Sequence, residues 1–121
     1  MAKTVLIVED NALNMKLFGD LLEAKGYATL RATEGHGALA LARRAHPDLV
    51  LMDIQLPGIS GMDVTRRMKA DPALRDIPVV ALTAFALRGD EEKILGSGCS
   101  AYVSKPVSID RLLDVVARHA A

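Results

Sequence analysis

The sequence has a single cysteine, no net charge and no long apolar run, and each scarcity argues against a class of protein. Cys99 has no second cysteine with which to form an internal disulfide, which is consistent with a reducing compartment. Fifteen basic residues balance fifteen acidic ones, whereas nucleic-acid-binding proteins usually carry a basic surplus or stripe. No stretch approaches the roughly 20 apolar residues that a membrane-spanning helix needs. We therefore expect a cytoplasmic protein without direct nucleic-acid binding and without membrane insertion.

The chain has enough hydrophobic residues for one packed core. Its 121 residues, half of them hydrophobic, predict a single domain over residues 1–121, and no linker or low-complexity tract divides them. Three short apolar runs are typical of strands that are covered on both faces. A segment that alternates in polarity predicts an edge strand, and a fifth short segment precedes the last helix. In chain order, the five candidate strands are residues 5–8, 28–32, 49–52, 79–82 and 101–103.

Apolar spacing predicts helices between these runs. Leu13, Leu17 and Leu21 recur every four residues, and Phe18 and Leu22 widen the same stripe. A stripe of this kind is typical of the helix face that packs against a core.

The last helix has the clearest periodicity. Apolar residues at 109, 112, 113 and 116 fall at i, i+3, i+4 and i+7, and Ser108 is a plausible N-cap. Gly26 stands where the first helix should end. Weaker patterns predict helices over residues 35–46, 61–70 and 86–96.

Five strand–helix repeats predict an α/β fold. We expect a doubly wound, five-stranded parallel sheet with helices on both faces, which is a three-layer sandwich. With the second strand at the edge, the natural strand order is 2-1-3-4-5. The topological switch point then lies between strands one and three, and ligands bind beside it at the carboxyl ends of the strands.

Three carboxylates follow the two strands at this switch point. Glu9 and Asp10 come after the first strand, and Asp53 comes after the third. Packed like charges repel, so the cluster calls for a compensating cation, either a divalent metal or Lys105 after the fifth strand. Oxygen ligands of this kind suit Mg²⁺. Asp10 and Asp53 could coordinate the ion directly, Glu9 could act through a water, and the backbone carbonyl of Gln55 could add a ligand.

The same edge carries groups suited to phosphoryl transfer. Thr83 brings a hydroxyl at the end of the fourth strand. A carboxylate can attack phosphorus to give an acyl phosphate, and Asp53 is the natural nucleophile because it follows the central strand. A metal ion and Lys105 would then offset charge on the phosphoryl oxygens.

Five segments together resemble the receiver domains of response regulators, and the resemblance covers essentially the whole chain in order. It implies the CheY-like version of the predicted fold. The matching segments are Val-Leu-Ile-Val-Glu-Asp-Asn at 5–11, Asp-Leu-Val-Leu-Met-Asp at 48–53, Leu-Pro-Gly-Ile-Ser-Gly at 56–61, Val-Val-Ala-Leu-Thr-Ala at 79–84 and Ser-Lys-Pro at 104–106.

The resemblance implies a role for each matching residue. Asp53 would accept the phosphoryl group, and the acidic pair after the first strand would hold Mg²⁺. Lys105 would contact the phosphate, Thr83 would move toward it, and Tyr102 would be the aromatic residue whose ring follows the threonine. The bond before Pro106 is commonly cis in the family. Phe85 lies at a position that tunes the access of water to the phosphoryl group.

The resemblance also implies partners. A histidine kinase or a histidine phosphotransferase would donate the phosphoryl group. A stand-alone regulator of this kind would act through protein contacts on sensor kinases or phosphatases, as a monomer or weak dimer, and not as an enzyme. Residues 8–18 and 82–92 resemble members of the family that control cell division.

Three alternatives remain open from the residues. An aspartyl phosphohydrolase would typically carry an acid two residues after Asp53, where this chain has Gln55. A flavodoxin-like cofactor binder would need glycines or hydroxyls in the first loop, where Glu9 and Asp10 would repel phosphate. A pseudo-receiver would bind partners without phosphorylation, although all the site residues are present. Taken alone, Asp10 could simply be the N-cap of the first helix.

Overall fold

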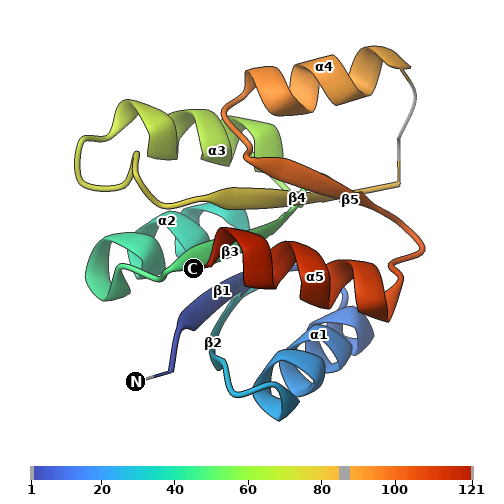
Figure 1. The fold of residues 1–121 in the computed structure, drawn as a ribbon. Coiled ribbons are helices and arrows are strands. Elements are labelled where there is room, and N and C mark those ends of the chain that lie inside the picture. Colours follow the sequence, from blue (N-terminus) through green and yellow to red (C-terminus); the bar gives the residue numbers. More distant parts are fainter. Residues whose placement is uncertain (1, 85–87, 121) are drawn as a thin grey trace.

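The computed structural model describes residues 2–84 and 88–120, and in these ranges strands and helices alternate along the chain (Figure 1). The predicted α/β class is confirmed. The elements are β1 (Thr4–Val8), α1 (Ala12–Ala24), β2 (Ala28–Ala32), α2 (Gly35–Ala45), β3 (Leu49–Asp53), α3 (Gly61–Ala70), β4 (Val79–Thr83), α4 (Arg88–Gly96), β5 (Ala101–Ser104) and α5 (Ile109–His119).

The strands form one parallel sheet in the order β2-β1-β3-β4-β5, as the sequence predicts. Val8 of β1 pairs with Met52 of β3, so the two strands at the switch point end side by side. Asp53 pairs with Leu82 of β4, which brings the end of the third strand level with that of the fourth.

Alternate residues of each strand face opposite helix layers. On one face, Leu6, Val50 and Val79 pack in a cluster with α2, α3 and Ile94 of α4. On the other face, strand residues pack in a cluster with α1 and α5, for example Ile7 with Leu112. Figure 1 shows the resulting three layers, with the sheet between the two helix layers. Burial on both faces explains why the central strands read as continuous apolar runs.

The predicted apolar stripe of α1 is confirmed only in part: Phe18 and Leu22 are buried, but the leucine row that defined it is out of phase with the buried face. Leu13 is 77% exposed and Leu17 is 46% exposed, whereas the buried face is formed by residues at i, i+3, i+4 and i+7. A recurrence every four residues drifts around a helix by about 40° per step, because one turn takes 3.6 residues. The stripe therefore winds off the buried side. The buried residues of α1 are Met15, Phe18, Gly19 and Leu22.

The predicted element ends are close to the observed ones. Gly26 follows α1 with a φ of 91°, which favours glycine. The side chain of Ser108 caps α5 by accepting a hydrogen bond from the backbone N–H of Arg111 at 3.4 Å. Ile109, at the start of the predicted α5 stripe, is 48% exposed. Residues 86–87 of the predicted fourth helix, and Phe85, lie outside the described residues.

Among the described residues, no helix combines the length and the apolar character that crossing a membrane requires.

The two leucine environments on α1 give a direct test of its phase. Leu22 is fully buried, so Leu22→Ala should lower the free energy of unfolding by about 2–5 kcal/mol, through lost apolar burial and the cavity that remains. Leu13→Ala, on the same helix, should change it by less than about 0.5 kcal/mol. Urea unfolding followed by circular dichroism measures both. Comparable losses in the two variants would contradict the assigned phase.

Candidate functional site

The carboxylates of Glu9, Asp10 and Asp53 meet at the carboxyl end of the sheet. One carboxylate oxygen from each residue can be chosen so that all lie within 4.8 Å of one another. The pairing of β1 with β3 causes this meeting, because parallel neighbouring strands end at the same edge. Glu9 and Asp53 are buried, whereas Asp10 is exposed. The predicted convergence of the three acids is therefore confirmed.

Asp10 is not the N-cap of α1. The helix begins at Ala12, and the side chain of Asn11 caps it by accepting a hydrogen bond from the backbone N–H of Asn14 at 3.0 Å. The N-cap alternative for Asp10 is thereby removed.

Asp53 has both carboxylate oxygens engaged. Its Oδ1 accepts a hydrogen bond from the backbone N–H of Gln55 at 3.0 Å, and its Oδ2 accepts one from Lys105 Nζ at 3.1 Å. The side chain is 4% exposed, so the Lys105 ammonium compensates a charge that water scarcely reaches. Gln55 thus contributes its backbone N–H here, while its side chain is exposed.

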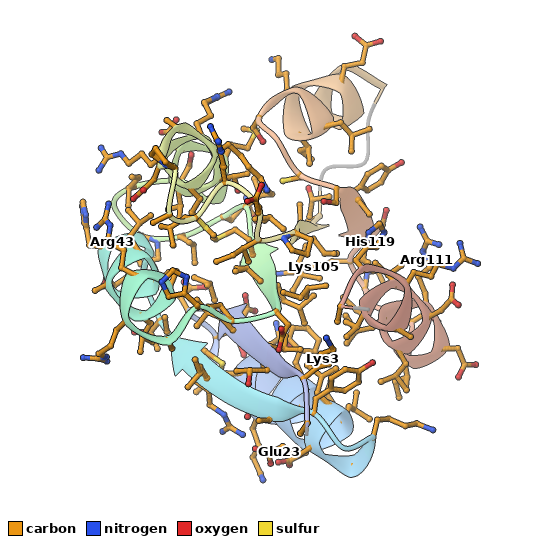
Figure 2. All side chains as sticks on the ribbon, turned by 60° about the vertical axis from the view of Figure 1, so that its left-hand side comes forward. Lys3, Glu23, Arg43, Lys105, Arg111 and His119 are labelled. Atoms are coloured by element: carbon orange, nitrogen blue, oxygen red, sulfur yellow. The ribbon has the colours of Figure 1, made fainter. Side chains whose placement is uncertain are left out.

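Lys105 reaches two of the three acids. Its Nζ lies 3.1 Å from Asp53 Oδ2 and 3.6 Å from Glu9 Oε1. The backbone N–H of Lys105 donates to the carbonyl of Thr83 at 2.7 Å. This bond holds the backbone of Lys105 beside the end of β4. The Lys105–Pro106 peptide is cis, as the resemblance implies. Figure 2 shows Arg43 and Arg111 at the periphery of the molecule, whereas Lys105 lies near the centre of that view.

Thr83 and Tyr102 occupy the predicted strands. Thr83 is the last residue of β4, is 1% exposed, and pairs with Ser104 of β5 at the same edge of the sheet as Asp53. Tyr102 is partly buried on β5 and packs against the core cluster of the α2–α3–α4 layer.

Glu9 is fully buried and has two chemically different oxygens. Its Oε1 accepts a hydrogen bond from Asn14 Nδ2 at 2.8 Å and lies near Lys105. Its Oε2 is buried with no hydrogen-bond partner among the described residues. Burial, together with the adjacent Asp53 carboxyl group, raises the pKa of Glu9 to about 7, against the opposing effects of Asn14 and Lys105.

Asn14 was missed by the sequence analysis. The available signal was its polar side chain in the first turn of α1, five residues after Glu9, but no motif specifies that contact.

The donor set fits a divalent cation. Three carboxylates lie within reach of one ion, and the orphaned Glu9 Oε2 is a buried acceptor that a cation or its bound water would satisfy. Lys105 contacts two of the acids but not Asp10 in the ion pairs of the described residues. Hard oxygen ligands without nitrogen or sulfur favour an ion such as Mg²⁺.

Gly61 brings the start of α3 against the backbone of Asp53. Its N–H donates to the carbonyl of Ile54 at 3.0 Å. A Cβ at this position would overlap the carbonyl oxygen of Asp53 and would lie 2.9 Å from Ile54 Cα. The absence of a side chain therefore permits the close approach that sets the Asp53 backbone.

Comparison with known proteins identifies extensive similarity. Residues 5–117 match the family model described as response regulator receiver domain. The polar-differentiation response regulator DivK of Brucella ovis is 60% identical over 116 residues, which cover 96% of this chain and 94% of that protein. DivK of Brucella anthropi is 59% identical over 116 residues, with the same coverage of each chain.

Solved structures show the same fold. The receiver domain of a sensor histidine kinase from Pseudomonas aeruginosa, solved with a magnesium ion coordinated in its active-site cleft, has a TM-score of 0.91 at 34% identity, covering 99% of this chain and 98% of the other. The chemotaxis response regulator CheY4 of Vibrio cholerae has a TM-score of 0.92 at 23% identity, covering 98% of both chains, and supports the fold alone.

The raised pKa of Glu9 makes stability depend on pH in the metal-free protein. The folded state holds the Glu9 proton up to about pH 7, whereas the unfolded chain releases it near 4.5. Stability from the neutral carboxyl group is thus present below pH 4.5 and is lost as pH rises toward 7. Relative to Glu9→Gln, the wild type should lose on the order of 3 kcal/mol of unfolding free energy between pH 4.5 and 8.

Urea unfolding in EDTA at several pH values measures this difference, and the Glu9→Gln variant serves as the reference for all other titrating groups. A difference between the two proteins that stays constant with pH would contradict the assigned pKa.

Gly61→Ala should be strongly destabilising, by about 2 kcal/mol or more, because the new methyl group overlaps backbone that cannot move aside cheaply. Gly96→Ala is the matched control, since a Cβ there meets nothing within 4 Å and alanine favours the helix. Thermal unfolding of both variants provides the measurement. Equal stability of the two variants would show that the contact between α3 and Asp53 is not close.

Proposed function

Because this chain belongs to the response regulator receiver domain family, we propose that it is a phosphorylation-controlled signalling switch whose phosphoacceptor is Asp53. The observation that carries the proposal is the bonding of this carboxylate. A buried Asp53 is held between the Gln55 N–H and the Lys105 ammonium, beside two further acids. The whole of residues 1–121 would act as one receiver domain.

We propose that the acidic cluster holds Mg²⁺. Asp10 and Asp53 would bind it directly, Glu9 would bind it through a water, and the backbone carbonyl of Gln55 would complete the protein ligands. Support comes from the three converging carboxylates and from the magnesium ion in the receiver domain from Pseudomonas aeruginosa. When bound, Mg²⁺ supplies positive charge that offsets the charge of the phosphoryl oxygens.

In the proposed step, an Asp53 carboxylate oxygen attacks the phosphorus of a phosphohistidine on a histidine kinase or a histidine phosphotransferase. The new P–O bond forms as the P–N bond breaks, and the bonding electron pair leaves with the imidazole nitrogen. Lys105, already 3.1 Å from Asp53 Oδ2, is placed to neutralise charge at the phosphoryl group. This self-phosphorylation, and hydrolysis of the acyl phosphate by water to free phosphate and the Asp53 carboxylate, would be the only chemistry of the chain.

A groove of about 560 Å³ between α1 and the segment after β5 offers a route to the site. Lys105 is one of its lining residues, so a donor seated there would lie beside the ion pair of Lys105 with Asp53. Its lining residues are Asn14, Leu17, Phe18, Ala84, Lys105, Pro106 and Val107.

The output would pass through a change in conformation. The added charge on Asp53 would draw the hydroxyl of Thr83 toward the phosphoryl group, and Tyr102 would follow by rotation of its ring. The affected surface would be that of α4, β5 and α5, and phosphorylation would shift the populations of two states. Protein partners such as sensor kinases or phosphatases would recognise this surface.

The biological process is proposed from the relatives. Two Brucella proteins about 60% identical to this chain are polar-differentiation response regulators. We infer a related role in the control of cell division or differentiation, carried out in the cytoplasm by a monomer or weak dimer without direct contact to nucleic acid.

Incubation with acetyl phosphate and Mg²⁺ should produce a protein carrying one phosphoryl group, with the adduct stable to acid and labile to base. Asp53→Asn should abolish this adduct, because an amide is not a nucleophile toward phosphorus. Intact-protein mass spectrometry measures the adduct. Asp63→Asn, which changes an exposed acid on α3, is the matched control and should label like the wild type.

Labelling of Asp53→Asn to the wild-type extent would place the phosphoacceptor elsewhere. Failure of the wild type to label from acetyl phosphate, and from every member of a panel of autophosphorylated histidine kinases, would overturn the proposed function.

A further inference from the structure

Asn14 connects the first turn of α1 to the acidic cluster. Its Nδ2 donates a hydrogen bond to Glu9 Oε1 at 2.8 Å, within the normal range for an N–H···O bond. Its backbone is fixed as well, because its N–H donates to the Asn11 side chain that caps the helix. The side-chain amide of Asn14 therefore extends from the capped first turn of α1.

The hydrogen bond from Asn14 gives the two oxygens of Glu9 different environments. Oε1 receives Asn14 Nδ2 and lies 3.6 Å from Lys105 Nζ, while Oε2 has no hydrogen-bond partner in the described part of the chain. Turning the carboxylate out of its present plane, or moving it away from α1, would break the bond to Asn14. The amide thus holds one placement of the group, in which the oxygen remote from Asn14 is left for a cation or its bound water.

The side chain of Glu9 requires a hydrogen-bond partner to fix the position of its carboxylate. A glutamate has one more rotatable bond than an aspartate, so the same backbone position allows its carboxylate a wider range of places. Lys105 holds it less firmly than Asn14 does, because its Nζ lies 3.6 Å from Glu9 Oε1, beyond hydrogen-bond distance, and hydrogen-bonds to Asp53 instead.

We propose that Asn14 is a positioning residue for the cation site. Its amide holds the Glu9 carboxylate in the orientation that binds Mg²⁺. The inference rests on the magnesium site of the proposed function and adds a residue outside its ligands. Groups that orient metal ligands typically change metal affinity by about 10- to 100-fold when they are removed. Because Glu9 is assigned to act through a water, we expect the lower end of this range.

The test is a titration of the whole chain with MgCl₂, followed by backbone amide chemical shifts in NMR. Asn14→Leu introduces a side chain of similar shape and good helix propensity but removes the amide donor. It should raise the Kd for Mg²⁺ about tenfold. Asn14→Gln keeps an amide donor and should restore part of the affinity. Lys16→Leu, an exposed position on the same helix, is the matched control and should bind like the wild type. Asn14→Ala repeats the comparison without added bulk.

A double-mutant cycle separates positioning from a general effect on the helix. If Asn14 acts through Glu9, Asn14→Leu should not weaken Mg²⁺ binding further when Glu9→Gln is already present. An equal further loss in that background would overturn the inference, as would a Kd in Asn14→Leu and Asn14→Ala that matches the wild type. A wild type that does not bind Mg²⁺ at all would instead count against the proposed function.

Discussion

Lys105 is the cation around which the acidic edge of the sheet is organised. It contacts Asp53 and Glu9, two carboxylates that are almost completely removed from water. Burying two carboxylates together is costly unless a positive charge accompanies them. The long side chain of Lys105 brings that charge from the end of β5. The compensation is incomplete, because one Glu9 oxygen stays without a partner among the described residues and the pKa of Glu9 is raised. The negative charge that Lys105 leaves uncompensated favours the binding of a second cation at this edge of the sheet.

The sheet topology brings these groups together. Glu9 and Asp10 lie 43 or more residues from Asp53 along the chain, yet β1 and β3 are direct neighbours and end level with each other. The parallel β3–β4–β5 pairing then places Thr83 and Lys105 on the same edge. Four of the five strands, β1, β3, β4 and β5, carry a polar site residue at or just after their ends and apolar residues within, so the packing of these strands also assembles the site.

The sequence predicted the strands, their order and the acidic edge because these depend on short-range signals. Apolar runs mark the buried strands, and strand order follows from which strand alternates in polarity. The contact of Asn14 with Glu9 could not be predicted, because it depends on the rotation of α1 about its axis. The misplaced leucine stripe shows how weakly a four-residue recurrence fixes that rotation. The close approach of Gly61 to Asp53 was equally hidden, since a glycine after a turn has many structural reasons to be there.

The contact between α3 and Asp53 gives the site a preferred direction of movement. The Asp53 carbonyl oxygen already lies where a methyl group on Gly61 would be, so the backbone of the acid has no room to retreat toward α3. Close-packed interiors resist compression and pass small displacements to whichever neighbour can yield. The backbone of Asp53 is therefore confined on its α3 side, so a change at its carboxylate has the least freedom in that direction.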